Sequence, residues 1–149
     1  MESTRILTIT MTEKFKILAK YIKDMSSETA DVETFLFVKE NISKYQLNID
    51  ITSKALKNKL IEVNTTLKFE DKELNQKKSH FEMTYVSIVK IDEEVKKEDL
   101  KKILLCDVQN KIYPNLEKAF LSMLHSSGFS EINFDKKIDF NKLYNKQSN

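Results

Sequence analysis

Several stretches in the first half of the chain alternate between apolar and polar positions. The alternation is cleanest from Tyr45 to Ile51, and it recurs from Ile61 to Phe69 and from Phe81 to Tyr85. A period of two places successive side chains on opposite faces of a strand, so each stretch predicts a strand with one buried face. A looser alternation from Phe15 to Asp24 predicts a first strand. The short spacings between the later strands favour an antiparallel meander.

Polar segments separate these predicted strands. Residues 23–33 are polar and small, which predicts a connection over the surface, and residues 70–78 predict a tight turn. An abrupt apolar run of four residues follows the first of these segments and lies between strands, where burial in the core is not the only explanation. Its members are Phe35, Leu36, Phe37 and Val38.

The apolar period becomes helical beyond Asp92. Two successive sets of apolar residues each have the spacing of one face of a helix. The first set is Val95, Leu100, Ile103 and Leu104, and the second is Leu116, Phe120, Met123 and Leu124. Pro114 suits a helix start or a kink, and Gly128 lies where a left-handed C-terminal cap belongs. The two residues are therefore predicted to bracket a helix of about four turns.

The end of the chain predicts two short elements. Ile132 and Phe134 indicate a weak last strand, and a helix is expected from Asp139 to about Asn145, with Asp139 as its N-cap. Together the elements predict an α+β fold: a roughly four-stranded antiparallel sheet with a long kinked helix and a short C-terminal helix on one face.

No linker or repeat divides the chain. We expect a flexible N-terminal segment over residues 1–14, one domain over 15–146 and a tail over 147–149, and either Met1 or Met11 is the start of translation. No apolar run approaches 18 residues, which predicts no membrane insertion, and the N-terminus lacks the apolar stretch of a secretory signal. These features predict a cytoplasmic protein.

Composition argues against several kinds of chemistry. One glycine in 149 residues cannot build a phosphate-binding or dinucleotide-binding loop, so no nucleotide cofactor is expected. Cys106 is the only cysteine, which precludes an internal disulfide and, with two histidines far apart, makes structural zinc improbable. No spacing places a nucleophile beside a base. We therefore expect no enzyme activity, no metal and no cofactor.

The charge of the chain is balanced, with 25 basic and 23 acidic residues. Lysine pairs occur at residues 77–78, 96–97, 101–102 and 136–137. They indicate either a solvated helix surface or a stripe that binds phosphate. No aromatic side chains are interleaved with them, as single-strand binders usually require. A nucleic-acid-binding module remains an alternative, and we expect no nucleic acid as a partner.

The most specific pattern lies at the C-terminus. Gly128-Phe129 is followed by IDFNKLY at residues 138–144, and this ending resembles the end of the SecB family of bacterial protein-export chaperones. Residues 21–28, YIKDMSSE, resemble the family's Tyr-x-Lys-Asp-(Ile/Leu)-Ser-x-Glu segment, and Pro114 stands fifteen residues before Phe129 as in the family's main helix.

The resemblance implies an ATP-independent holdase, a homotetramer built as a dimer of dimers, that binds unfolded preproteins and delivers them to the SecA export motor. Client binding is predicted in a groove between the apolar run and the terminal helix, with the residues Phe35, Leu36, Phe37, Val38, Phe140, Leu143 and Tyr144. Motor binding is predicted at Asp24, Glu28 and Glu82. Simple packing of the terminal helix, ordinary solvated carboxylates, and a chaperone dedicated to one partner such as an antitoxin remain alternatives.

Overall fold

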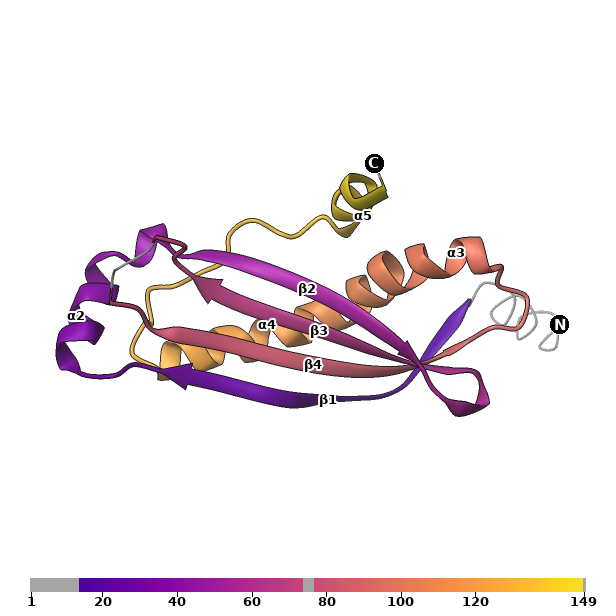
Figure 1. Ribbon diagram of the computed structural model, residues 1–149, viewed down its shortest axis with the longest axis horizontal. Coiled ribbons are helices and arrows are strands. Elements are labelled where there is room, and N and C mark those ends of the chain that lie inside the picture. The colour runs from indigo at the N-terminus through magenta and orange to yellow at the C-terminus, as the bar shows by residue number, and fades with distance from the viewer. Residues whose placement is uncertain (1–13, 74–76, 149) are drawn as a thin grey trace, which may run out of the picture.

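Four strands form one antiparallel sheet in the order β1-β4-β3-β2. The computed structural model describes residues 14–73 and 77–148, so Met1, Met11 and nearly all of the predicted N-terminal segment lie outside the described residues. The strands are β1 (Phe15–Glu28), β2 (Gln46–Ala55), β3 (Leu60–Glu70) and β4 (His80–Ile91). Each predicted strand of the meander is present, and β1 is an edge strand beside β4 (Figure 1).

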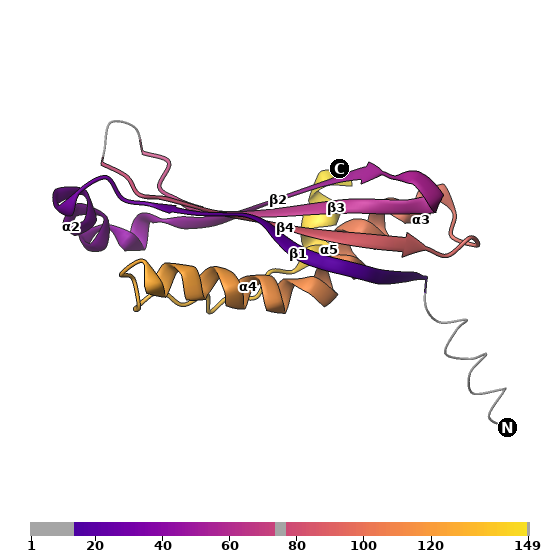
Figure 2. The same ribbon diagram turned by 90° about the horizontal axis from the view of Figure 1, so that it is seen from below.

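The helices lie mainly on one face of this sheet (Figure 2). They are α2 (Val32–Glu40), α3 (Lys97–Lys102), α4 (Val108–Ser126) and α5 (Phe140–Ser148), and short 3-10 turns occupy Ile42–Lys44 and Lys57–Lys59. A π-helical segment, Ile103–Asp107, joins α3 to α4 in one long helix. The predicted α+β architecture is confirmed. No helix among the described residues is long and apolar enough to cross a membrane.

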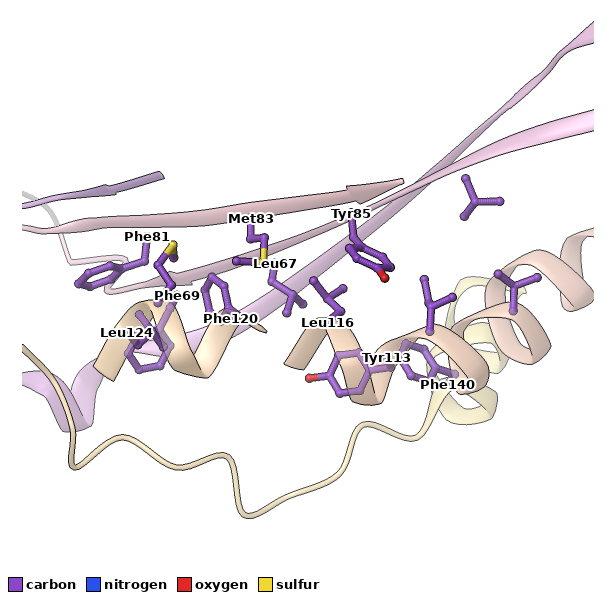
Figure 3. Packing of buried hydrophobic residues seen from close by; sticks show 14 of the residues in the cluster. Leu67, Phe69, Phe81, Met83, Tyr85, Tyr113, Leu116, Phe120, Leu124 and Phe140 are labelled. Atoms are coloured by element: carbon purple, nitrogen blue, oxygen red, sulfur yellow. The ribbon is translucent and has the colours of Figure 1, made fainter. Parts of the chain in front are cut away.

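The core lies between the long helix and the inner faces of β3 and β4. Phe81, Met83 and Tyr85 alternate along β4 and point toward α4, where Leu116 and Phe120 meet them (Figure 3). The strand period of two and the helix period of 3.6 therefore place their apolar residues on facing surfaces. This is the packing that the sequence pattern predicted.

β1 is longer than predicted. It runs to Glu28, so residues 23–28 belong to the strand, and only residues 29–31 connect it to α2. The register against β4 shifts between Ile17 and Ala19 and again between Ile22 and Asp24. Each bulge inserts one extra residue and moves the following side chains to the opposite face. These shifts interrupt the alternation of apolar and polar residues, which explains why the sequence predicted a strand that ends at Asp24.

The long helix begins earlier than predicted. Pro114 lies inside α4 and not at its start, because Val108 already follows the π-helical segment without a break. Gln109 is fully buried at this junction, where its Nε2 donates to the carbonyl of Leu104 and its Oε1 accepts from Thr65 of β3. A π-helical turn alters the regular backbone hydrogen bonds, and Gln109 satisfies one carbonyl while it ties the helix to the sheet.

The predicted cap at Gly128 is confirmed. Its φ is +105°, its N–H donates to the carbonyl of His125, and the N–H of Phe129 donates to the carbonyl of Leu124. These two bonds form the Schellman motif that ends many helices. A Cβ at Gly128 would lie 2.6 Å from Cε1 of Phe35, so the glycine also lets α2 approach the end of α4.

The predicted strand at Ile132 and Phe134 is wrong. Residues 129–139 form an irregular connection that returns along α4, in the helix layer, where no strand edge is available for pairing (Figure 3). Its apolar side chains still enter the core, since Phe134 contacts Phe69 at 5.6 Å between ring centroids. The terminal helix is confirmed as α5, and Oδ1 of Asp139 accepts from the N–H of Lys142 as an N-cap.

Candidate functional site

Large apolar side chains are exposed on β1 and α2. On β1 the exposed fractions range from 43% to 59%, and on α2 they reach 73% for Val32 and 55% for Leu36. The residues on β1 are Leu18, Tyr21, Ile22 and Met25, which we call the β1 patch. Exposed large apolar side chains gathered on one element are candidates for a binding site, because the fold itself does not use them.

The β1 patch lies on the free edge of the sheet. One side of β1 pairs with β4, and no strand of the described residues pairs with its other side. Within the patch, Tyr21 stands opposite Val86, whereas Met25 stands opposite Met83 on the helix side of the sheet. Sequence reasoning missed this patch because the bulges disrupt the alternation. The available signal was three large apolar residues within five positions: Tyr21 and Ile22 at the end of the predicted strand and Met25 in the predicted polar connection.

α2 forms because Asp31 caps it. Oδ1 of Asp31 accepts from the N–H of Thr34 at 2.8 Å. Hydrogen bonding to the side chain of Thr34, and then to its backbone, lowers the pKa of the Asp31 carboxyl. Val32, Phe35 and Leu36 follow at positions i, i+3 and i+4, so they lie on the same side of the helix. We call these three residues the α2 face. Phe35 is half-buried, and its ring lies 5.2 Å from that of Phe129.

The four predicted client residues at 35–38 are therefore in a helix with two different sides. Leu36 points to solvent, Phe35 and Phe37 are half-buried, and Val38 is fully buried. Val38 belongs to the core and offers no surface in this chain. Val32 was not among the predicted residues, although it precedes Leu36 by one helical turn.

The predicted residues of α5 pack against the π-helical segment and the start of α4. Phe140 is 3% exposed, its ring meets Tyr113 edge-on at 5.3 Å, and its carbonyl accepts from the Sγ of Cys106 at 3.5 Å. Leu143 and Tyr144 are half-buried. Burial raises the pKa of the Cys106 thiol and of the Tyr113 hydroxyl, because the charged forms lose hydration.

α2 and α5 do not lie next to each other. Both views place α2 at one end of the sheet and α5 well away from it along the long axis (Figures 1 and 2). Residues 129–139 carry the chain back along α4 before α5 begins. The two groups of predicted client residues therefore do not face each other across a groove within one chain.

The three predicted motor residues share the outer face of the sheet. Ser26 lies opposite Glu82, and the neighbours of Ser26 on the same face are Asp24 and Glu28. Glu82 forms an ion pair with Lys68 at 3.4 Å, while Asp24 and Glu28 are exposed. The arrangement forms a small acidic surface. In the described part of the chain, no three His, Cys, Asp or Glu residues gather into a site for a metal ion.

Comparison with known proteins identifies the family. The model of the family described as preprotein translocase subunit SecB matches residues 9–149. The chain belongs to the SecB family. A putative protein-export protein SecB from Pelagibacter ubique is 59% identical, covering 93% of this chain and all of the relative. A protein-export protein SecB from Anaplasma marginale (strain Florida) is 24% identical, covering 99% of this chain and 90% of the relative.

A solved structure has the SecB fold as well. It is a SecB-like chaperone from Mycobacterium tuberculosis in complex with a peptide of the HigA1 antitoxin, with a TM-score of 0.59. It covers 92% of this chain and all of the other, and at 7% identity the likeness shows the fold alone. The resemblance inferred from residues 21–28 and 138–144 is thus confirmed, and the family supports the predicted role as a preprotein chaperone.

Proposed function

We propose that this SecB protein is an ATP-independent holdase, which captures unfolded or slow-folding preproteins in the cytoplasm and delivers them to the SecA motor. The single observation that carries the proposal is the α2 face, where Val32 and Leu36 remain exposed although the chain has a full core. Membership of the SecB family supports the preprotein as the client. The protein acts by binding and needs no catalytic residue and no cofactor.

The α2 face supports weak, non-selective capture. Burial of a large apolar side chain contributes roughly 1.5–3 kcal/mol before the cost of ordering the client is subtracted. Two or three such contacts hold a chain only briefly. Several faces on one assembly multiply the affinity, because each further contact is intramolecular.

Such an assembly is a homotetramer, a dimer of dimers. The β1 patch lies on an unpaired strand edge, and antiparallel pairing with a second β1 would satisfy that edge and bring the two β1 patches beside each other. The replacement of Ile22 and Met25 by lysine places charges in this contact. Sedimentation of the double variant should give a smaller species than the wild type, and an unchanged mass would exclude β1 from the interface.

The acidic surface of Asp24, Glu28 and Glu82 is the proposed SecA contact. Asp24 and Glu28 expose their carboxylates, which suits a basic surface of the motor, and Glu82 lies beside them in an ion pair with Lys68. The double variant Asp24→Lys with Glu82→Lys should bind SecA more weakly and capture clients as well as the wild type does. Unchanged SecA affinity would refute this assignment.

A chaperone dedicated to one partner is the second candidate. It is favoured by the fold likeness to the Mycobacterium tuberculosis protein, whose structure contains an antitoxin peptide. The two candidates differ in the range of clients. A general holdase binds many unrelated unfolded chains, whereas a dedicated one binds a single sequence.

The α2 face provides the test of the proposed function. Val32→Ser with Leu36→Ser removes the exposed apolar surface, and Glu33→Ser with Glu40→Ser changes two exposed polar positions of the same helix as a control. Both variants are compared in the suppression of aggregation of a chemically denatured protein. The first variant should lose most of the suppression and the control should keep it. Equal suppression by both would show that α2 is not the client surface.

A further inference from the structure

Two apolar recesses lie along α3. The first, with a volume of about 440 Å³, lies between α3 and β2, and the second, of about 250 Å³, lies between α3 and the ends of β3 and β4. Lys97 and Leu100 line both recesses, so the two recesses adjoin along α3, and we call them together the α3 groove. The groove is distinct from the α2 face, since α3 and α2 lie at opposite ends of the molecule (Figure 1).

The α3 groove has an apolar floor and a basic rim. Ile51, Leu100 and Leu104 form part of the floor of the first recess, with Lys97 and Lys101 beside them. No acidic residue lines either recess. Neither Lys97 nor Lys101 lies within ion-pair distance of a carboxylate in the part of the chain that the structure describes. Both lysines are exposed, so their charges are available to a ligand.

We propose that the α3 groove binds client segments in which apolar and acidic residues alternate. The proposal rests on the holdase function and specifies the chemistry of its clients. Uncompensated ammonium groups beside an apolar surface favour a ligand that brings carboxylates and apolar side chains together. A basic segment would be repelled by the lysines, and a purely apolar segment would leave them unpaired.

The spacing of the lysines fits an extended ligand. Lys97 and Lys101 are four residues apart on α3, a rise of about 6 Å along the helix axis. Side chains on one face of an extended chain repeat about every 6.6–6.8 Å. Two carboxylates at positions i and i+2 of a client therefore match the two lysines. The residues between them point to the opposite side, away from α3 and toward Ile51 of β2, which lines the other wall of the first recess.

Peptides of opposite charge test the proposal with the full-length protein. Two fluorescent peptides are used, one alternating Glu with Leu and one alternating Lys with Leu, and binding is measured by fluorescence anisotropy at low and at high salt. The wild type should bind the acidic peptide about fivefold more tightly than the basic one, since two exposed charge pairs contribute modestly. High salt should reduce the preference, because it screens exposed charges.

Charge reversal in the protein completes the test. Lys97→Glu with Lys101→Glu should invert the preference toward the basic peptide. Lys118→Glu with Lys136→Glu changes the net charge equally at two exposed lysines that line neither recess, and it should retain the acidic preference. An unchanged preference in the Lys97 and Lys101 variant would overturn the proposal. The proposal would also be overturned if the wild type showed no peptide preference and the Lys97 and Lys101 variant had a changed oligomeric mass. That result would assign the α3 groove to contact with a second copy of the chain.

The result separates this inference from the holdase function. If the wild type suppresses aggregation but binds both peptides equally, only the preference for acidic clients is refuted. If it neither suppresses aggregation nor binds either peptide, the proposed function itself is refuted.

Discussion

Replacement of Gly128 by alanine tests the contact between α2 and the end of α4. The φ of +105° lies in a region that an alanine adopts at a cost, and the added Cβ would lie 2.6 Å from Cε1 and 3.0 Å from Cζ of Phe35. Separations below 3.0 Å force one group to move. We expect the ring of Phe35 to shift and to lose part of its contact with Phe129.

The magnitude follows from three contributions. A left-handed backbone costs an L-residue roughly 1–2 kcal/mol. The weakened Phe35–Phe129 contact costs about 0.5–1.5 kcal/mol. The smaller entropy of the unfolded alanine chain offsets about 0.4–1 kcal/mol. We therefore expect Gly128→Ala to lower the free energy of unfolding by about 2 kcal/mol.

Urea unfolding measures this change at a fixed protein concentration, because self-association would otherwise alter the apparent stability. The same glycine substitution is also made in a Phe35→Leu background, where the ring atoms that meet the Cβ are absent. There the cost should fall to about 1 kcal/mol, which is the backbone contribution less the offset from the unfolded chain. Equal costs in the two backgrounds would refute the contact between Gly128 and Phe35, and a cost near zero in the wild type would refute the strained cap as well.

Three further predictions concern the helices. The thiol of Cys106 should react slowly with a maleimide at neutral pH in the folded protein, because it is buried and its pKa is raised, and Phe140→Ala should increase the rate; equal rates would contradict the packing of α5. Gln109→Leu should destabilise the protein by about 1–3 kcal/mol in urea unfolding, since it leaves a buried carbonyl and the hydroxyl of Thr65 without their partner; no loss would argue against that role. Because the pKa of Asp31 is lowered in the folded protein, its cap stabilises α2 fully at pH values above the ordinary carboxyl pKa of about 3.9. This stabilisation is lost as the pH falls through the lowered pKa of the folded state. Asp31→Asn should remove this part of the acid dependence of helix content, and an unchanged acid profile would refute the cap.

The sequence predicted those elements whose period is regular. β2, β3, β4 and the apolar stripe of α4 follow uninterrupted patterns, and Gly128 is the one residue able to form its cap without strain. α2 escaped assignment because the short run from Phe35 to Val38 fits a strand as well as a helix. The cap at Asp31 was the local signal for the helix.

The site was less predictable than the fold. Which apolar residues remain exposed depends on tertiary placement. The first bulge turns Ile22 to the opposite face from the one that a regular alternation would give it, and the second bulge restores the original phase before Met25. Likewise the path of residues 129–139, which moves α5 away from α2, has no period that a sequence pattern could reveal. Family resemblance predicted the fold and the role, but only the packing of the structure shows that Leu36 is exposed whereas Val38 is buried.

The most direct test of the holdase function is the spontaneous refolding of a slow-folding preprotein with and without this protein, in moderate salt and without ATP. A fast-folding protein serves as the control. Refolding of the preprotein should stop at stoichiometric amounts of this protein, because exposed apolar segments are captured before they are buried, while the control refolds normally. Uninhibited refolding of the preprotein would contradict the holdase function.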